Sequence, residues 1–349
     1  MQQLEQPRLD GFSRLFKSFL EAGRRSLSAV RGVFLTRFHE EDFVQNEWPL
    51  ELIERARSED VSVVEISIEE AEARQVVAID TSSIIVATDR KGVVTAVRGS
   101  LVTRTPLGLT VEKIGPFIAY ITQENMPEVL ASILDGASPL DYCAVDYQLD
   151  GSIQKVLAGL LEKRLQEYVA EKYRNSILLF DGSLSAGPLD NPLWLVSRIL
   201  EKALPRGNDV LAFSKTSILQ FWGEVFTEEK LGISPPYAID MTWLIKSIEM
   251  RVKVLGKTFL AKLSPGASVF RVDVSTTKKV QQVFGDFLRS DSLIYGYPEL
   301  LILAHDYCTF TKVDVMAIQS LLKRYGSEFF EIFSIRDMLF NPLDGEWRR

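Results

Sequence analysis

The chain has few of the residues that disulfide scaffolds and zinc clusters require. Its 349 residues include two cysteines, Cys143 and Cys308, and these have no CxxC spacing. This argues against a disulfide framework and a zinc site, and it favours a reducing, cytoplasmic setting. Apolar residues make up 46% of the chain, so a protein of this length buries enough surface to fold without such crosslinks.

Long apolar stretches are also missing. The first residues read MQQLEQPRLD and lack the apolar segment of a secretory signal, so we expect no such signal. The longest apolar runs, such as Leu300 to Ala304, are far shorter than a bilayer-spanning helix needs. Both absences predict a protein that does not enter a membrane.

Positive charge is not in excess, and the common nucleotide-binding motifs are absent. The net charge is −7, which counts mildly against a protein that coats nucleic acid. Residues 8–37 and 246–262 are nevertheless rich in Lys and Arg, and they are either parts of a basic groove or solvated helix faces. No GxxxxGK[ST], GxGxxG or GxSxG occurs, so P-loop, Rossmann and α/β-hydrolase chemistry are not supported.

The order of strand and helix patterns predicts the fold class. Amphipathic spacing predicts one or two helices within residues 10–37, packed on the core by default, and a short helix at 49–58. Apolar, β-branched segments predict strands at 61–68, 76–80, 84–88, 93–102 and 107–122, with a turn at 81–83 and a loop at 136–151. Helices at 152–173 and 188–204 then alternate with strands at 177–180 and 209–213, and a strand at 268–274 precedes helices at 277–288 and 313–325. An antiparallel meander followed by parallel strands with crossover helices predicts a ribonuclease H-like α/β fold.

Two aspartates follow apolar strands in this scheme. Asp80 closes VVAID and Asp181 follows ILLF, each before small residues. In an open α/β sheet, ligands bind beyond the carboxyl ends of the strands, so neighbouring strands would bring these carboxylates together. Carboxylate oxygens suit Mg²⁺ or Mn²⁺. Each Asp alone is as well explained as a turn former, but the pair favours a metal site.

A third acid is expected from the helix before Asp181. The candidates are Glu162, Glu167 and Glu171. On a helical wheel of ~100° per residue, Glu162 lies nearly opposite the apolar stripe and Glu167 lies at its border. We therefore expect Glu167 to be the ligand, against the general alternative of a solvated helix glutamate.

Four further residues could serve a metal or phosphate site. His305 follows the apolar run LLILA and could bind metal or act as an acid, or be held in the core by a backbone carbonyl. Tyr297 could donate a hydrogen bond to phosphate. Lys215, in FSKTS, and more weakly Arg271, in VFRVDV, could neutralise a phosphate.

Taken in order, these motifs resemble the NurA nucleases. The matching pieces are AIDTSS around Asp80, LLFDGSL around Asp181, FSKTS around Lys215, FRVD around Arg271, and YPELLILAH from Tyr297 to His305. They extend from about residue 74 to 312, which is most of the chain. The ordered set is more specific than any single piece.

The resemblance implies a ribonuclease H-like nuclease that prefers Mn²⁺, with Mg²⁺ as the alternative. It implies action on single- and double-stranded DNA, as a 5′ to 3′ exonuclease and a single-strand endonuclease. It also implies a homodimer that docks on a hexameric HerA-type helicase for DNA end resection and repair in archaea and some bacteria. By position, Asp80, Asp181 and a helix Glu resemble the family's metal ligands, and Tyr297 and His305 resemble its C-terminal active-site pair.

The expected organisation is a helical arm at 1–60, a NurA-like nuclease domain at 61–330 and a tail at 331–349. The expected chemistry is metal-assisted phosphodiester hydrolysis. Asp80, Asp181 and Glu167 would hold one or two ions, and His305 would bind metal or assist the leaving group. Lys215 and Tyr297 would offset charge on the phosphate. One departure from the family is Thr81, which replaces a usual Gly and would be strained if that position needs a positive φ.

Two other functions compete with this one. An inactive NurA-like adaptor that only binds a helicase or DNA would have an incomplete acid cluster. A phosphotransferase of the actin and sugar-kinase type shares the core fold and also places an Asp before small residues. Such an enzyme needs a second glycine-containing phosphate hairpin and an adenosine-binding segment, and the sequence shows neither.

Overall fold

The computed structural model describes residues 16–30, 34–35, 62–134, 152–187, 191–215, 232–248, 253–325 and 328–329. The helix expected at 49–58 and the loop expected at 136–151 lie outside these residues. The division into an arm, a nuclease domain and a tail at residues 60 and 330 stays a prediction.

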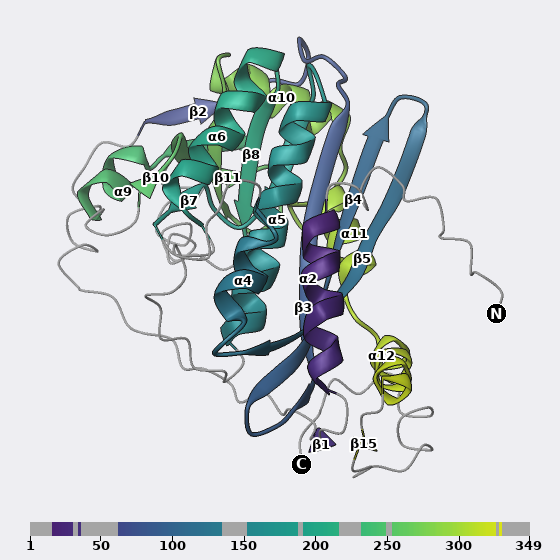
Figure 1. Ribbon diagram of the computed structural model, residues 1–349. Helices are drawn as coiled ribbons and strands as arrows, with labels where there is room; N and C mark the ends of the chain where they lie inside the picture. The colour runs from purple at the N-terminus through teal and green to yellow at the C-terminus, as the bar shows by residue number, and fades with distance from the viewer. Residues whose placement is uncertain are drawn as a thin grey trace.

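A nine-stranded mixed sheet forms the centre of the molecule (Figure 1). Its strand order is β2-β9-β11-β12-β8-β6-β3-β4-β5. The strands are β2 (Val63–Glu65), β3 (Val76–Thr88), β4 (Gly92–Thr105), β5 (Gly108–Thr122), β6 (Ile177–Asp181), β8 (Asp209–Ser214), β9 (Tyr237–Asp240), β11 (Lys257–Lys262) and β12 (Phe270–Ser275). Strand β6 pairs in parallel with β3 and β8, and the other neighbouring strands of this sheet pair antiparallel.

This topology confirms the ribonuclease H-like fold class. Strands β3, β4 and β5 form the antiparallel meander, and β6 and β8 extend the sheet on the other side of β3. The chain reaches β6 through helix α5 (Ser152–Lys172) and reaches β8 through α6 (Leu193–Ala203). A crossover helix is the usual way for a chain to place its next strand parallel to the last one.

The turn expected at residues 81–83 does not exist. Strand β3 runs through it, and Thr81 pairs with Gly99 of β4. Thr81 is not among the described residues with a positive φ, so its β-branched side chain is not strained there. Residues 81–84 are half-buried, and the first three of them are polar. This polar segment in the middle of the strand looks like a turn when the sequence is considered alone.

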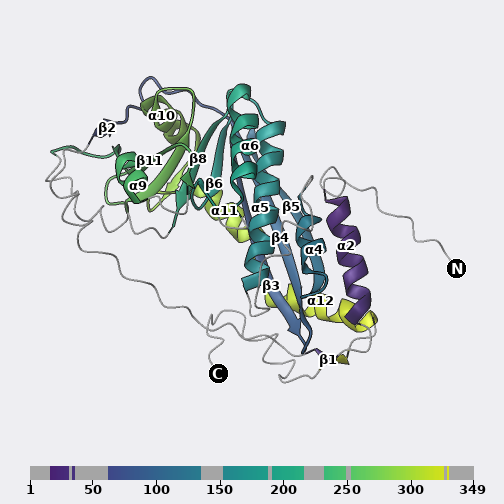
Figure 2. The ribbon, with the colours of Figure 1, turned by 60° about the vertical axis from the view of Figure 1, so that its left-hand side comes forward.

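Helices cover both faces of the sheet (Figures 1 and 2). On one face α5 packs on Val77 and Ile79, and on the other α11 (Glu299–Cys308) packs on Val76 and Ala78. The other helices of the described residues are α2 (Lys17–Leu27), α4 (Met126–Ala131), α9 (Thr242–Ile248), α10 (Val280–Ser290) and α12 (Lys312–Arg324), with 3-10 turns η1 (Ser28–Val30) and η3 (Leu204–Arg206). Two-residue strands pair outside the main sheet: β1 (Phe34–Leu35) with β15 (Glu328–Phe329), β7 (Ser185–Ala186) with β10 (Lys253–Val254), and β13 (Leu293–Ile294) with β14 (Tyr297–Pro298). Among the described residues, no helix combines the length and apolar character that crossing a bilayer demands.

The amphipathic helix expected near the N-terminus is α2, and it packs on the sheet. Phe16 and Phe19 are each 1% exposed, and their rings contact Phe117 of β5 at centroid distances of 5.2 and 5.4 Å. Its apolar face is therefore part of the core, as default packing predicts.

An ion pair ties α12 to the sheet. The guanidinium of Arg98, in β4, donates to both carboxylate oxygens of Asp314 at 2.7 and 3.2 Å. Asp314 also completes a capping box with Thr311 at the start of α12. The hydrogen bonds from Arg98 hold the pKa of Asp314 well below its usual range.

We expect Asp314→Asn to lower the free energy of unfolding by about 2 kcal/mol at neutral pH, because a charged pair and part of a cap are lost. A carboxyl group whose pKa is lowered by folding stabilises the folded state at pH values above its pKa in the unfolded chain, about 4. This contribution is lost as the pH falls towards the lower pKa of the folded protein. Urea unfolding of both proteins across a pH series should therefore show a constant difference at neutral pH that shrinks in acid. A difference that does not change with pH would contradict this assignment.

Candidate active site

The candidate site lies where two central strands part. The parallel pairing of β3 with β6 ends at Ile79 and Phe180, while β3 continues along β4 to Thr88. Asp80 and Asp181 are the next residues on the two strands. The sheet thus opens between two carboxylates, one in the middle of a strand and one at a strand end.

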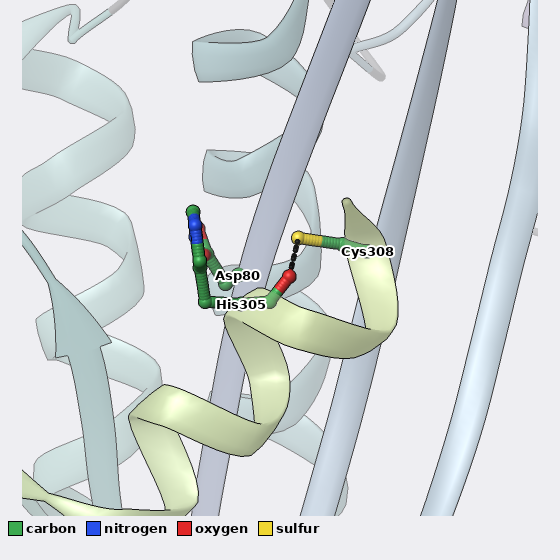
Figure 3. A group of neighbouring side chains, drawn as sticks. All are labelled: Asp80, His305 and Cys308. Atoms are coloured by element: carbon green, nitrogen blue, oxygen red, sulfur yellow. Dashed lines mark hydrogen bonds and ion pairs between the residues drawn. The ribbon is translucent and has the colours of Figure 1, made fainter. Parts of the chain in front are cut away.

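Asp80 is almost fully enclosed, at 5% exposure. One carboxylate oxygen accepts the backbone N–H of Thr81 at 2.7 Å, and the other lies 2.8 Å from Nδ1 of His305. His305 projects from α11 towards β3, as Figure 3 shows. The hydrogen bond with Asp80 raises the pKa of His305, although its side chain is half exposed. Asp80 and His305 are therefore in direct contact, although they are 225 positions apart in the sequence, farther than any other two of the expected site residues.

Asp181 has its own pair of partners. The hydroxyl of Tyr297 donates to it at 3.1 Å, and Nζ of Lys215 lies 2.6 Å away. The same ammonium group sits 5.8 Å from the centre of the Tyr297 ring. Burial, together with the carboxylate of Asp181, raises the pKa of Tyr297, so its hydroxyl stays protonated and serves as a donor. Gly182 follows with a φ of 94°, a left-handed turn that directs the chain away from the site.

Glu162 of α5 is a third, largely buried acid in this region. Burial raises its pKa to about 7; Lys163 works against the rise, and the charges of Asp80 and Asp181 add to it. Its oxygen Oε1 accepts hydrogen bonds from Gln166 at 2.7 Å and from Nζ of Lys163 at 3.4 Å. Glu162 is therefore affected by the charges of both aspartates while its own carboxylate is held by neighbours on α5.

The structure does not bring Glu167 to this group. Its carboxylate is 2% exposed and accepts hydrogen bonds from Arg164 at 2.6 Å, Lys202 at 2.8 Å and Arg198 at 3.1 Å. Burial alone would raise its pKa, but Lys202 and Arg164 lower it. The expectation failed because α5 has two buried sides, and the border of its apolar stripe faces α6. Glu171 is also placed at α6, where it pairs with Lys202.

Arg271 is mostly buried and is paired with an acid. Its guanidinium donates to both oxygens of Asp273 at 3.0 and 2.8 Å, and its side chain is 14% exposed. Asp273 also accepts the backbone N–H of Leu184, in the loop after Asp181, at 2.9 Å. Arg271 thus supports that loop, and its expected contact with phosphate stays a prediction.

The residues at the opening fit a divalent cation. Asp80, Asp181 and Glu162 offer carboxylate oxygens, the donors that Mg²⁺ and Mn²⁺ prefer. Burial is the main cause of the raised pKa of Glu162, and a cation would offset the smaller part that comes from Asp80 and Asp181. The donor set does not distinguish between these two ions.

The sequence matches no family model and no curated protein. Similar solved structures include the NurA nuclease from Sulfolobus solfataricus, which is 18% identical over 79% of this chain and 90% of its own, with a TM-score of 0.47. A second NurA structure is 8% identical over 79% of this chain and 91% of its own, at 0.40. An endonuclease V from Bacillus subtilis is 9% identical over 74% of this chain and 88% of its own, at 0.34. Such identities do not carry an activity from one chain to another, so function has to be argued from the site.

The placement of Glu167 gives a stability prediction. We expect Glu167→Gln to lower the free energy of unfolding by about 2–3 kcal/mol, because the buried carboxylate that pairs with Arg164, Lys202 and Arg198 would lose its charge. Glu171→Gln is the matched control, since Glu171 shares Lys202 but its side chain is 57% exposed. That change should cost less than about 1 kcal/mol in the same denaturant titration. Equal losses in the two variants would show that the buried cluster is not structural.

Proposed function

We propose that this protein is a metal-dependent DNA nuclease of the NurA type that hydrolyses phosphodiesters. The observation that carries the proposal is the pair of carboxylates, Asp80 and Asp181, that directly follow the last paired residues of β3 and β6. His305 is bonded to the first, and Tyr297 and Lys215 are bonded to the second. An inactive adaptor would have an incomplete acid cluster, and in this proposal Glu162 takes the ligand role that was expected for Glu167. The ordered motifs from Asp80 to His305 support the NurA type among metal-dependent nucleases.

Each side chain has a distinct task in this proposal. Asp80, Asp181 and Glu162 would hold one or two Mn²⁺ or Mg²⁺ ions, and such ions would offset phosphate charge and lower the pKa of bound water. Tyr297 and Lys215 keep the Asp181 carboxylate in one orientation. The flexible, 41% exposed Lys215 can also turn its charge towards a phosphate oxygen.

His305 is placed for proton handling or for metal binding. Its bond to Asp80 fixes the ring, while half of the side chain stays accessible to substrate. In its protonated form the imidazole can donate a proton to the leaving oxygen of the cleaved phosphodiester. In the neutral form the nitrogen facing Asp80 can be a ligand.

The finer assignment follows the motif resemblance. We propose 5′ to 3′ exonuclease and single-strand endonuclease action on single- and double-stranded DNA, in end resection and repair. The proposed assembly is a homodimer that works with a HerA-type hexameric helicase in the cytoplasm of an archaeon or bacterium. Mn²⁺ is the expected ion.

The proposal is tested by cleavage of end-labelled single-stranded DNA with Mn²⁺. We expect Asp80→Asn, Asp181→Asn and Glu162→Gln each to lower the cleavage rate by at least about 100-fold, because each removes a charge that holds the ion. Glu171→Gln is the matched control on the same helix and should cleave like the wild type. The assay is run with and without a HerA-type helicase.

Other outcomes separate the alternatives. If the wild type cleaves nothing under either condition, the adaptor function replaces this proposal. If Glu162→Gln cleaves normally while the Asp variants do not, the third ligand is assigned to the wrong glutamate. Circular dichroism of each variant establishes that lost activity does not reflect unfolding.

A further inference from the structure

A buried thiol lies beside the Asp80–His305 pair. Cys308 is one turn after His305 on α11, so both side chains project from the same side of the helix. A carboxylate oxygen of Asp80, a ring nitrogen of His305 and the sulfur of Cys308 all lie within 4.8 Å of one another. Figure 3 shows the three residues together, with Asp80 contributed by β3 and the other two by α11.

We propose that Asp80, His305 and Cys308 form a metal subsite for a thiophilic divalent ion such as Zn²⁺ or Co²⁺. The inference deepens the proposed function, on which it rests, because Asp80 belongs to both ligand sets. The nitrogen and the sulfur both come from α11, and the carboxylate comes from β3.

The donor types discriminate between metals. Zn²⁺ and Co²⁺ accept thiolate, imidazole and carboxylate together, whereas Mg²⁺ and Mn²⁺ favour oxygen. Three protein ligands that leave a position open are typical of catalytic zinc sites. His305 is the accessible member of the three, since its side chain is half exposed whereas Asp80 and Cys308 are buried.

The thiol proton can leave without breaking the helix end. The sulfur donates to the carbonyl of His305 at 3.2 Å. The same carbonyl also accepts the N–H of Thr309 at 3.0 Å and its hydroxyl at 2.8 Å. When the ion binds, the S–H bond breaks, a sulfur–metal bond forms and the proton passes to solvent, while the carbonyl keeps two donors.

A structural role for Cys308 is the competing explanation. The cysteine is fully buried, and a small residue could simply fill space at the end of α11. Space filling, however, does not require the sulfur to lie beside a carboxylate and an imidazole. The two explanations differ in one measurable property, which is whether sulfur binds the ion.

Cobalt titration of the full-length protein tests the subsite. We expect Co²⁺ to produce a sulfur-to-cobalt charge-transfer band in the near ultraviolet, which Zn²⁺ removes by displacement and Mg²⁺ does not. Cys143→Ser is the matched control and should keep the band, while Cys308→Ser and Cys308→Ala should lose it. His305→Ala should weaken Co²⁺ binding at least about tenfold, the lower end of the effect expected when a metal site is perturbed.

The proposal is overturned if the wild type gives no sulfur band, or if the band survives in both Cys308 variants. It is also overturned if the folded His305→Ala protein binds Co²⁺ as tightly as the wild type. Because the side chain of His305 is half exposed, this variant tests the subsite even if the variants of the buried Cys308 unfold. The readout does not depend on DNA. Mn²⁺-dependent cleavage without a sulfur band would reject the metal subsite and support the nuclease. A sulfur band without any cleavage would support the subsite and reject the nuclease.

Discussion

The separation of β3 from β6 is the constraint on which the site depends. As long as the two strands pair, backbone hydrogen bonds fill the space between them and no side chain from the far face can enter. Beyond Ile79 and Phe180 that pairing stops, and Asp80 and Asp181 are the residues that follow at this point. The long β3–β4 pairing keeps the sheet intact where its other side is open.

Two glutamates of one helix show how surroundings decide the use of a carboxylate. Glu167 is surrounded by three cations, so its charge is compensated and contributes to packing α5 against α6. The pKa of Glu162 is raised by burial and by the charges of Asp80 and Asp181, and Lys163, 3.4 Å away, offsets only part of this rise. Poorly compensated charge of this kind is typical of sites that bind ions, because the free energy of ion binding offsets the cost of placing like charges close together.

The order of strands and helices could be predicted from sequence because each apolar strand and amphipathic helix carries its own periodicity. The convergence of Asp80, Asp181, Tyr297 and His305 was also predictable, since all belong to ordered motifs, and their roles stay predictions. The identity of the helix glutamate was not predictable, because a helical wheel shows which side is buried but not which neighbour buries it. Cys308 gave no signal either, since its partner Asp80 lies in a distant strand and no CxxC spacing marks it.

The position of Asp80 within a strand has a consequence for how the site moves. Its backbone is held in the middle of the β3–β4 ladder, whereas Asp181 precedes a glycine turn and His305 lies near a helix end. Local opening begins at turns and helix ends long before it reaches the middle of a sheet. We therefore expect the backbone of Asp80 to be the least mobile part of the site. The residues around it would move to accommodate substrates or ions of different size.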